Sequence, residues 1–206
     1  MARDAWFRNA EWNSDIEAAF FAKLKRARDK SQYLRVQACT LASTHPRIAL
    51  RLLDQYFALG DNFDAAQAHV DRATAFLSLG QVEDALASYE AALSVEAKSP
   101  NYQTQASLGL PFVVACQGIV ARYEQALDLL DRYQSKLSFP VEYFRWHTAR
   151  ALISSAVGVA AEAKVQARLA LAAAEKDHSG FQYHPSVGLV GESYQQIRQR
   201  LASLAG

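Results

Sequence analysis

The sequence predicts an all-α fold made of antiparallel helical hairpins stacked on one another. Its 206 residues contain only 9 glycines and 5 prolines, so little interrupts helix formation along the chain. The one β-like run, Phe112-Val113-Val114, lies inside a longer helical pattern. The pattern of residues 69–80 recurs at 147–158 with a constant offset. A fixed internal period is typical of stacked-repeat proteins.

Helix-breaking residues divide the chain into segments of about one helix each, with breaks at Thr44-His45-Pro46, Gly60, Gly80, Phe139-Pro140 and Gly158. The expected helices cover residues 15–29, 31–43, 46–59, 63–79, 82–97, 102–120, 122–137, 141–157, 159–176 and 191–204. Because the connections between them are short, helices that follow one another in the chain are expected to pack antiparallel.

The N-terminal segment is expected to cap the stack. Ser14 and Glu17 have the spacing of a capping box, in which two side chains satisfy free amides at the start of the first helix. The aromatic residues Trp6, Phe7 and Trp12 precede this helix. We expect them to fold back onto the first hairpin, since exposed clusters of large aromatics are uncommon in soluble monomers. The alternative is an exposed anchor for a partner.

Two later segments depart from a plain succession of helices. Gly109-Leu110-Pro111 falls within the helix expected over 102–120. Because proline lacks an amide hydrogen and clashes with the preceding turn, we expect a kink or a late start there. Residues 177–190 contain two glycines and a proline that are incompatible with a continuous helix, so they predict a long loop.

The predicted loop has three possible roles. His178, Tyr183 and His184 are side chains of the kind found in metal or general-base sites, but their spacing matches no metal-ligand pattern, so no metal is expected. We expect Phe181, Tyr183 and Val187 to dock on the last hairpin, with the helix near 191–204 as a cap. In a third arrangement the loop folds into a groove of the stack and regulates access to it.

Small residues, aromatics and a glycine recur at fixed places in the central hairpin. Within residues 66–99 these places are filled by Ala73, Phe76, Gly80, Ala85, Tyr89 and Ala92. This stretch resembles a tetratricopeptide repeat, a helical hairpin of 34 residues. Residues 141–176 resemble a degenerate copy that keeps Ala151, Gly158, Ala163 and Ala170 but has Ser154 and Ala167 in place of the aromatics.

The resemblance implies a right-handed superhelix of antiparallel hairpins that forms a single domain over 1–206. Residues 1–30 would be the N-terminal capping segment, 31–176 about four hairpins, and 177–206 the loop and the C-terminal capping helix. The first helix of each hairpin lines a concave groove in such domains, so the resemblance implies a non-enzymatic module that binds a peptide or helix of a partner protein. Carried over onto this chain, the groove residues are Gln67, Val70, Asp71, Thr74, Leu77 and Ser78, with Arg145, Thr148, Leu152 and Ser155 from the degenerate copy. The Lys/Asn clamp of the chaperone-binding members is missing, so a chaperone co-factor role is not expected.

The repeated His-x-x-Arg pattern supports a different hypothesis. His69 and Arg72, like His147 and Arg150, are three residues apart and therefore share a helix face. Such a pair is suited to bind an anion, which would make the chain a small-molecule or anion sensor, or an enzyme, with the 177–190 loop as a lid. In the simpler interpretation the histidines pack between hairpins and the arginines pair with acids of an adjacent helix. Self-association into a homo-oligomer is a third possibility.

Composition excludes several classes of partner. The 22 Lys and Arg against 21 Asp and Glu give a net charge of +1, which disfavours nucleic acid. The sequence has no signal-like start and no stretch apolar enough for a membrane span. Two distant cysteines, Cys39 and Cys116, suggest reduced thiols in the cytoplasm. Phosphate-binding loops and nucleophile motifs are missing, so neither a cofactor nor catalysis is expected.

Overall fold

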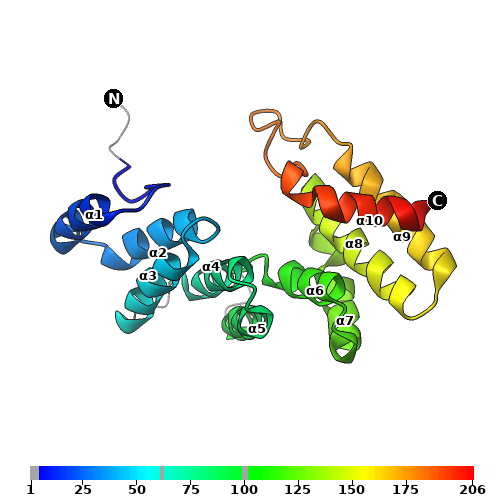
Figure 1. The fold of residues 1–206 in the computed structure, drawn as a ribbon, viewed down its shortest axis with the longest axis horizontal. Helices are drawn as coiled ribbons and strands as arrows, with labels where there is room; N and C mark the ends of the chain where they lie inside the picture. The colour runs from blue at the N-terminus through cyan, green and yellow to red at the C-terminus, as the bar shows by residue number, and fades with distance from the viewer. Residues whose placement is uncertain (1–4, 61–62, 99–101) are drawn as a thin grey trace. The chain divides into compact units, whose positions relative to one another are not determined.

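The computed structural model describes residues 5–60, 63–98 and 102–206, and every regular element in these residues is helical (Figure 1). The α-helices are α1 (Ser14–Arg26), α2 (Lys30–Leu41), α3 (Pro46–Ala58), α4 (Ala65–Ser78), α5 (Val82–Lys98), α6 (Ala106–Gln117), α7 (Tyr123–Tyr133), α8 (Pro140–Ala156), α9 (Ala160–Ala174) and α10 (Gln195–Ala205). Short 3-10 helices occupy Val120–Arg122, Gln134–Lys136 and Glu192–Tyr194. The predicted all-α fold is confirmed, and each expected helix is present near its predicted position. None of the helices in the described residues is long and apolar enough to cross a membrane.

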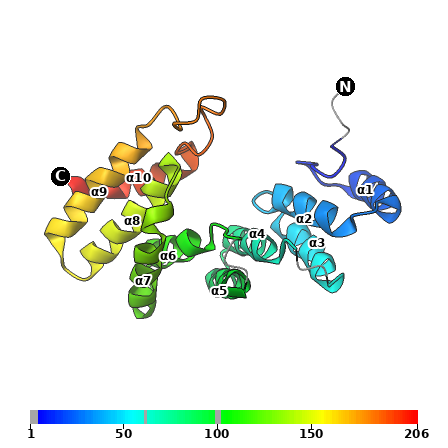
Figure 2. The ribbon, with the colours of Figure 1, turned by 180° about the vertical axis from the view of Figure 1, so that it is seen from behind.

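Helices that follow one another in the chain pack against one another in space. The chain divides into two compact units, which are unit 1 (Met1–Ala106) and unit 2 (Ser107–Gly206). In unit 1, α2 packs on α3 and α4 packs on α5. In unit 2, α8, α9 and α10 lie side by side, as both views show (Figures 1 and 2). The prediction of one continuous domain over 1–206 remains a prediction.

The first helix is capped differently from the prediction. The N-cap is Asn13, whose side-chain oxygen accepts hydrogen bonds from the amides of Asp15 and Ile16. The predicted capping box of Ser14 and Glu17 is therefore wrong. The Glu17 carboxylate instead accepts a hydrogen bond from Trp12 Nε1 at 2.8 Å, which ties the N-terminal segment to α1. Asparagine and serine cap helices about equally well, so local sequence did not distinguish Asn13 from its neighbour.

The N-terminal aromatics fold back onto the first helices, as predicted. The ring of Trp6 lies 5.4 Å from that of Phe20 and 4.9 Å from that of Tyr33. Trp12 also packs on Phe20, edge to face, at 5.6 Å between ring centroids. The buried side chain of Gln37 holds the segment in place, because it both accepts from the Asn9 amide and donates to the Asn9 carbonyl. This cap closes one end of the hydrophobic core of unit 1.

Buried alanines allow the helices of each pair to approach closely. Ala73, Ala85 and Ala92 have no exposed surface between α4 and α5. Ala151 and Ala170 are equally buried between α8 and α9. Small side chains at helix crossings let the helix axes come together while the larger residues fill the space around them. The turns after α4 and α8 contain glycines with positive φ.

α6 begins later than residue 102, where the helix was expected to start. Of the kink and the late start expected for this region, the late start is therefore observed. The helix begins at Ala106, whose amide donates to the Thr104 hydroxyl at 3.2 Å. The buried Glu96 carboxylate of α5 accepts from both the amide and the hydroxyl of Thr104. Pro111 lies inside the helix.

The C-terminal helix caps unit 2, also as predicted. Leu201 of α10 is fully buried in a cluster with Phe144 of α8 and the small residues of α9. The 177–190 segment forms no helix, which confirms the predicted loop. Its expected docking is wrong for Tyr183, which is 84% exposed. Phe181 makes one stacked contact with Phe139, at 5.0 Å between ring centroids, and otherwise remains exposed.

Candidate functional site

The predicted groove residues of α4 separate into buried and accessible side chains. Val70 and Asp71, which the family pattern places in the groove, are buried in the structure. Thr74 is half-buried, and its hydroxyl donates to the Val70 carbonyl at 3.1 Å. Leu77 is also half-buried, and Ser78 is exposed. α4 packs against α5, α3 and α2, and these neighbours cover its buried residues.

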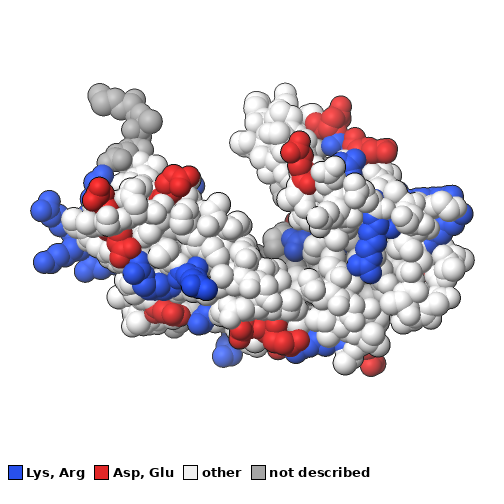
Figure 3. All heavy atoms as spheres, viewed as in Figure 1, with Lys and Arg blue, Asp and Glu red and all other residues white. Residues whose placement is uncertain are grey.

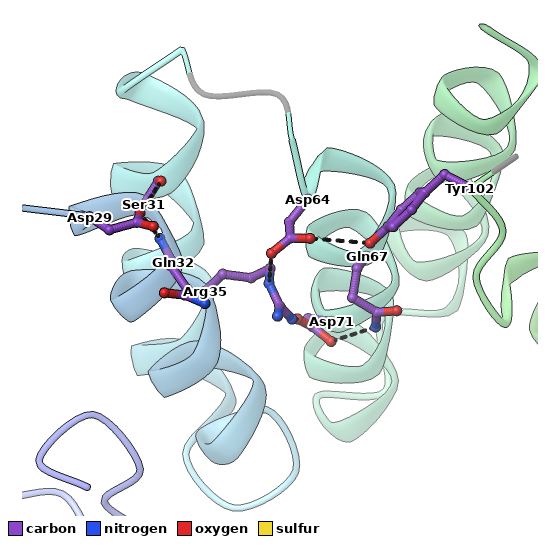
Figure 4. A network of polar contacts seen from close by, with 8 residues as sticks. All are labelled: Asp29, Ser31, Gln32, Arg35, Asp64, Gln67, Asp71 and Tyr102. Atoms are coloured by element: carbon purple, nitrogen blue, oxygen red, sulfur yellow. Dashed lines mark hydrogen bonds and ion pairs between the residues drawn. The ribbon is translucent and has the colours of Figure 1, made fainter. Parts of the chain in front are cut away.

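Asp71 belongs to a polar network that connects α2 and α4 (Figure 4). The Arg35 guanidinium of α2 donates to Asp64 at 3.0 Å and to Asp71 at 3.2 Å. Gln67 donates to the other oxygen of Asp71 at 3.0 Å, and the Tyr102 hydroxyl donates to Asp64 at 3.2 Å. Burial raises the pKa of Asp71, and the hydrogen bonds from Gln67 and Arg35 limit that rise. The network therefore connects α2 to α4, and the carboxylates of Asp64 and Asp71 both have hydrogen-bond partners.

His69 and Arg72 have the geometry of a packing pair. His69 stacks on Phe57 of α3 at 4.6 Å between ring centroids. Arg72 donates to Asp54 of α3 at 3.1 Å, and its guanidinium also lies over the rings of Phe57 and Phe76. Burial lowers the pKa of His69, and the charge of Arg72 lowers it further. An anion at this arginine would compete with Asp54 for the guanidinium.

The predicted groove residues of α8 are only partly accessible. Thr148 is 0% exposed and Leu152 is 2% exposed, although the family pattern places both in the groove. Ser155 is exposed. Arg145 is half-buried, with its guanidinium 5.0 Å from the centroid of the Phe112 ring. The face of α8 expected to be concave is therefore largely covered within unit 2.

The second His-x-x-Arg pair makes two unrelated sets of contacts. Arg150 donates to Asp131 of α7, and its guanidinium lies 4.4 Å from the centroid of the Trp146 ring. His147 Nδ1 lies 2.6 Å from the Gln166 side-chain oxygen on α9. Burial lowers the pKa of His147, which favours the neutral ring, and the hydrogen bond with Gln166 opposes that shift. The two residues share a helix face but do not form one site.

A pocket in unit 2 brings His147 together with part of the predicted loop. It has a volume of about 430 Å³ and lies between α8, α9 and the segment that follows α9. This volume is in the range of small-ligand sites. The lining residues are Ser138, Pro140, Tyr143, His147, Leu169, Ala172, Ala173, Lys176, His178, Ser179 and Gly180. Of the residues singled out from the sequence as candidate anion ligands, the pocket contains only His147, and Arg150 does not line it.

Internal hydrogen bonds hold the loop beside the pocket. The Ser179 hydroxyl donates to the His184 carbonyl at 2.7 Å, and the Ser179 amide donates to the Pro185 carbonyl at 2.8 Å. The amide of Val141 at the start of α8 donates to the Gly188 carbonyl. The loop thus forms a structured wall of the pocket. Sequence reasoning did not find Lys176 or Leu169, because nothing in the chain around them marks a pocket formed by tertiary packing.

Metal ligands, a cysteine thiol and a basic cluster are three further groups of side chains that could carry chemistry or binding. In residues 5–60, 63–98 and 102–206, no three His, Cys, Asp or Glu side chains lie close enough to hold a metal ion. Burial raises the pKa of Cys116 to about 11, so this thiol is not an activated nucleophile at neutral pH. Lysines and arginines gather at the exposed C-terminal end of α1 (Figure 3), where positive charge is favoured by the helix dipole.

Comparison with known proteins assigns no family to this architecture. No protein-family model matches the chain, and neither a curated protein nor a solved structure is similar enough to count as a match.

Proposed function

We propose that the chain is a tetratricopeptide-like, non-enzymatic binding protein that holds a segment of a partner protein at the pocket of unit 2. Three features support the repeat assignment, which are the packing of consecutive helices, the buried alanines at their crossings and the positive-φ glycines in the turns. Repeat proteins of this kind bind partners through surfaces built from several helices.

The observation that carries the binding proposal is the apolar surface around the pocket mouth. Val165 and Leu169 lie four residues apart on one face of α9 and are 51% and 44% exposed. Tyr143 and Phe181, from α8 and the loop, are exposed to a similar degree. Leu169 and Tyr143 also line the pocket itself. Exposed apolar side chains beside a pocket mark interaction sites, because their burial by a partner is favourable.

The occupant that fits this surface is a peptide segment with a large apolar side chain. That side chain would enter the pocket against Leu169, Ala172 and Ala173, while the rest of the segment would follow Val165 along α9. This arrangement differs from the groove predicted from the family pattern, because Thr148 and Leu152 are buried.

Selection of displayed random peptides on the purified full-length chain tests the proposal. We expect Leu169→Arg to weaken the selected peptides by at least about tenfold, because a charge at the pocket mouth opposes burial of an apolar side chain. Leu59→Arg is the matched control, since Leu59 is a similarly exposed leucine at the C-terminal cap of α3 in unit 1. The proposal fails if no peptide is enriched, or if both variants bind the selected peptides as the wild type does.

The same surface could be occupied by a second copy of the chain instead. Light scattering over a range of concentrations separates the two cases. A monomer at all concentrations is expected. A dimer that Leu169→Arg converts to a monomer would overturn the proposal in favour of self-association.

A further inference from the structure

The orientation of one buried amide determines what His147 offers to the pocket. Gln166 Nε2 donates to the Glu162 carboxylate at 2.8 Å, and a carboxylate only accepts. The Gln166 oxygen therefore faces His147 Nδ1, which must carry the proton of their 2.6 Å hydrogen bond. In a neutral ring the remaining nitrogen, Nε2, is then an acceptor. His147 lines the pocket, and the Glu162–Gln166–His147 chain leaves Nε2 as its acceptor nitrogen.

The loop contributes a hydrogen-bond donor to the pocket. The Gly180 amide donates to His178 Nδ1 at 2.9 Å, so this nitrogen carries no proton. In the neutral ring the proton is on Nε2, which makes His178 a hydrogen-bond donor. Both histidines line the same pocket, with one acceptor and one donor.

Lys176 adds a positive charge at the pocket wall. Its side chain is exposed, and no carboxylate lies within 4.0 Å of it in the part of the chain that the structure describes. An ammonium without an ion-pair partner beside an apolar pocket is available to a carboxylate of an occupant.

The hydroxyl protons of the pocket are already donated to backbone carbonyls of the protein. Tyr143 donates to the Leu137 carbonyl, Ser138 to the Lys136 carbonyl and Ser179 to the His184 carbonyl. The side-chain donors left for a carboxylate are therefore those of His178 and Lys176, and His147 Nε2 is available as an acceptor for an N–H.

From this inventory we propose that the pocket recognises an N-acylated apolar amino acid. Its carboxylate would accept from Lys176 and His178, its amide N–H would donate to His147 Nε2, and its side chain would pack on Leu169 and Ala173. The end of a peptide chain and a free N-acyl amino acid share this chemistry. The inference rests on the proposed binding role of the pocket and names what that role selects.

Titrations of the ¹⁵N-labelled full-length chain with small probes test each group, with the imidazole resonances as the readout. N-acetyl-L-leucine is expected to shift the Nε2 resonances of His147 and His178. N-acetyl-L-leucinamide lacks the negative charge and is expected to bind at least about tenfold more weakly. The probe 4-methylpentanoate keeps the carboxylate and the side chain but lacks the N–H, so it is expected to leave the His147 resonance nearly unmoved.

A matched pair of variants assigns the carboxylate contact. Lys176→Met should reduce the preference for the acid over the amide to about twofold or less, because the ammonium is lost. Lys136→Met removes an exposed lysine that does not line the pocket, and it should keep the full preference. Both lysines are exposed, so neither substitution disturbs the core.

The same titrations distinguish a peptide end from a free N-acyl amino acid as the ligand. Together with the peptide selection, they also separate failure of the ligand assignment from failure of the proposed binding role. Acetyl-Gly-Gly-Leu binding about tenfold more tightly than N-acetyl-L-leucine would indicate a peptide end, and equal affinity a small molecule. An amide that binds as tightly as the acid overturns the inference, as does an unchanged preference in Lys176→Met. If the inference is overturned but display-selected peptides still lose affinity in Leu169→Arg, the proposed binding of a peptide at the pocket is still supported. If those peptides keep their affinity in Leu169→Arg, both the ligand assignment and the proposed function are wrong.

Discussion

At the scale of single residues, the two arginines of the repeated pattern show how one local sequence is used twice. Arg72 and Arg150 each donate to an acid on the preceding helix, Asp54 and Asp131 respectively, and each lies over an aromatic ring. In both, Nε is buried without a hydrogen-bond partner in the described residues. A guanidinium that is partly desolvated and incompletely bonded adds little net stability.

This view predicts that leucine can replace Arg72. Arg72→Leu should keep the free energy of unfolding within about 1 kcal/mol of the wild type, because the apolar volume is retained and the unsatisfied Nε is removed. Arg72→Asp should lower it by about 2 kcal/mol or more, since it puts two like charges together. Urea denaturation at pH 7 measures both. A loss of about 2 kcal/mol in the leucine variant would show that the ion pair with Asp54 stabilises the fold.

At the scale of elements, the connection between α9 and α10 depends on one close approach. Gly188 has a φ of +71°, and a Cβ at this position would lie 2.6 Å from the Phe139 side chain. Phe139 in turn stacks on Phe181 of the same loop. Gly180 also has a positive φ, but a Cβ there would meet nothing within 4 Å. A side chain at Gly180 would therefore introduce backbone strain alone, whereas one at Gly188 would add steric overlap with Phe139.

Alanine at these two positions is expected to have unequal effects. Both Gly180→Ala and Gly188→Ala introduce the strain of positive φ, which costs roughly 1–2 kcal/mol. Gly188→Ala should cost about 1–3 kcal/mol more, because Phe139 must move and the loop loses its stacked contact. Free energies of unfolding, together with the rate of proteolysis within 177–190, provide the measurement. Equal losses in the two variants would contradict the importance of the Phe139 contact.

At the scale of the whole molecule, each unit has an end that is closed by a segment outside its helical pairs. The aromatic N-terminal segment covers Phe20 in unit 1, and α10 covers Phe144 and the alanines of α9 in unit 2. Terminal segments of this kind are required in repeat proteins, because the last hairpin otherwise exposes its apolar face.

Removal of one side chain from the C-terminal cap should loosen unit 2. Leu201→Ala is expected to lower the free energy of unfolding by about 2–5 kcal/mol, because it leaves a cavity at a fully buried position. Leu169→Ala, at an exposed position of the same unit, should cost about 0.5 kcal/mol or less. Hydrogen exchange should increase in α8, α9 and α10 of the first variant and remain unchanged in α2 and α3. Faster exchange in α2 and α3 would contradict this assignment.

By itself, the sequence determined the helices and their pairing. Apolar periodicity, glycines at turns and alanines at crossings are local signals, and they located the ten α-helices of the described residues, the loop over 177–190 and both terminal caps. Local signals also predicted that the arginines of the His-x-x-Arg pairs would meet acids on an adjacent helix, although they did not identify Asp54 and Asp131.

Tertiary structure alone decided which side chains remain accessible. Thr148 and Leu152 occupy positions that the family pattern assigns to an open groove, but packing within unit 2 buries them. The pocket is lined by Tyr143 and His147 of α8 together with Lys176 and His178, which follow α9. Arg35 of α2 forms ion pairs with Asp64 and Asp71, which are distant from it in the sequence. A helical pattern specifies which face of a helix is apolar, whereas the cover over that face depends on contacts between residues far apart in the chain.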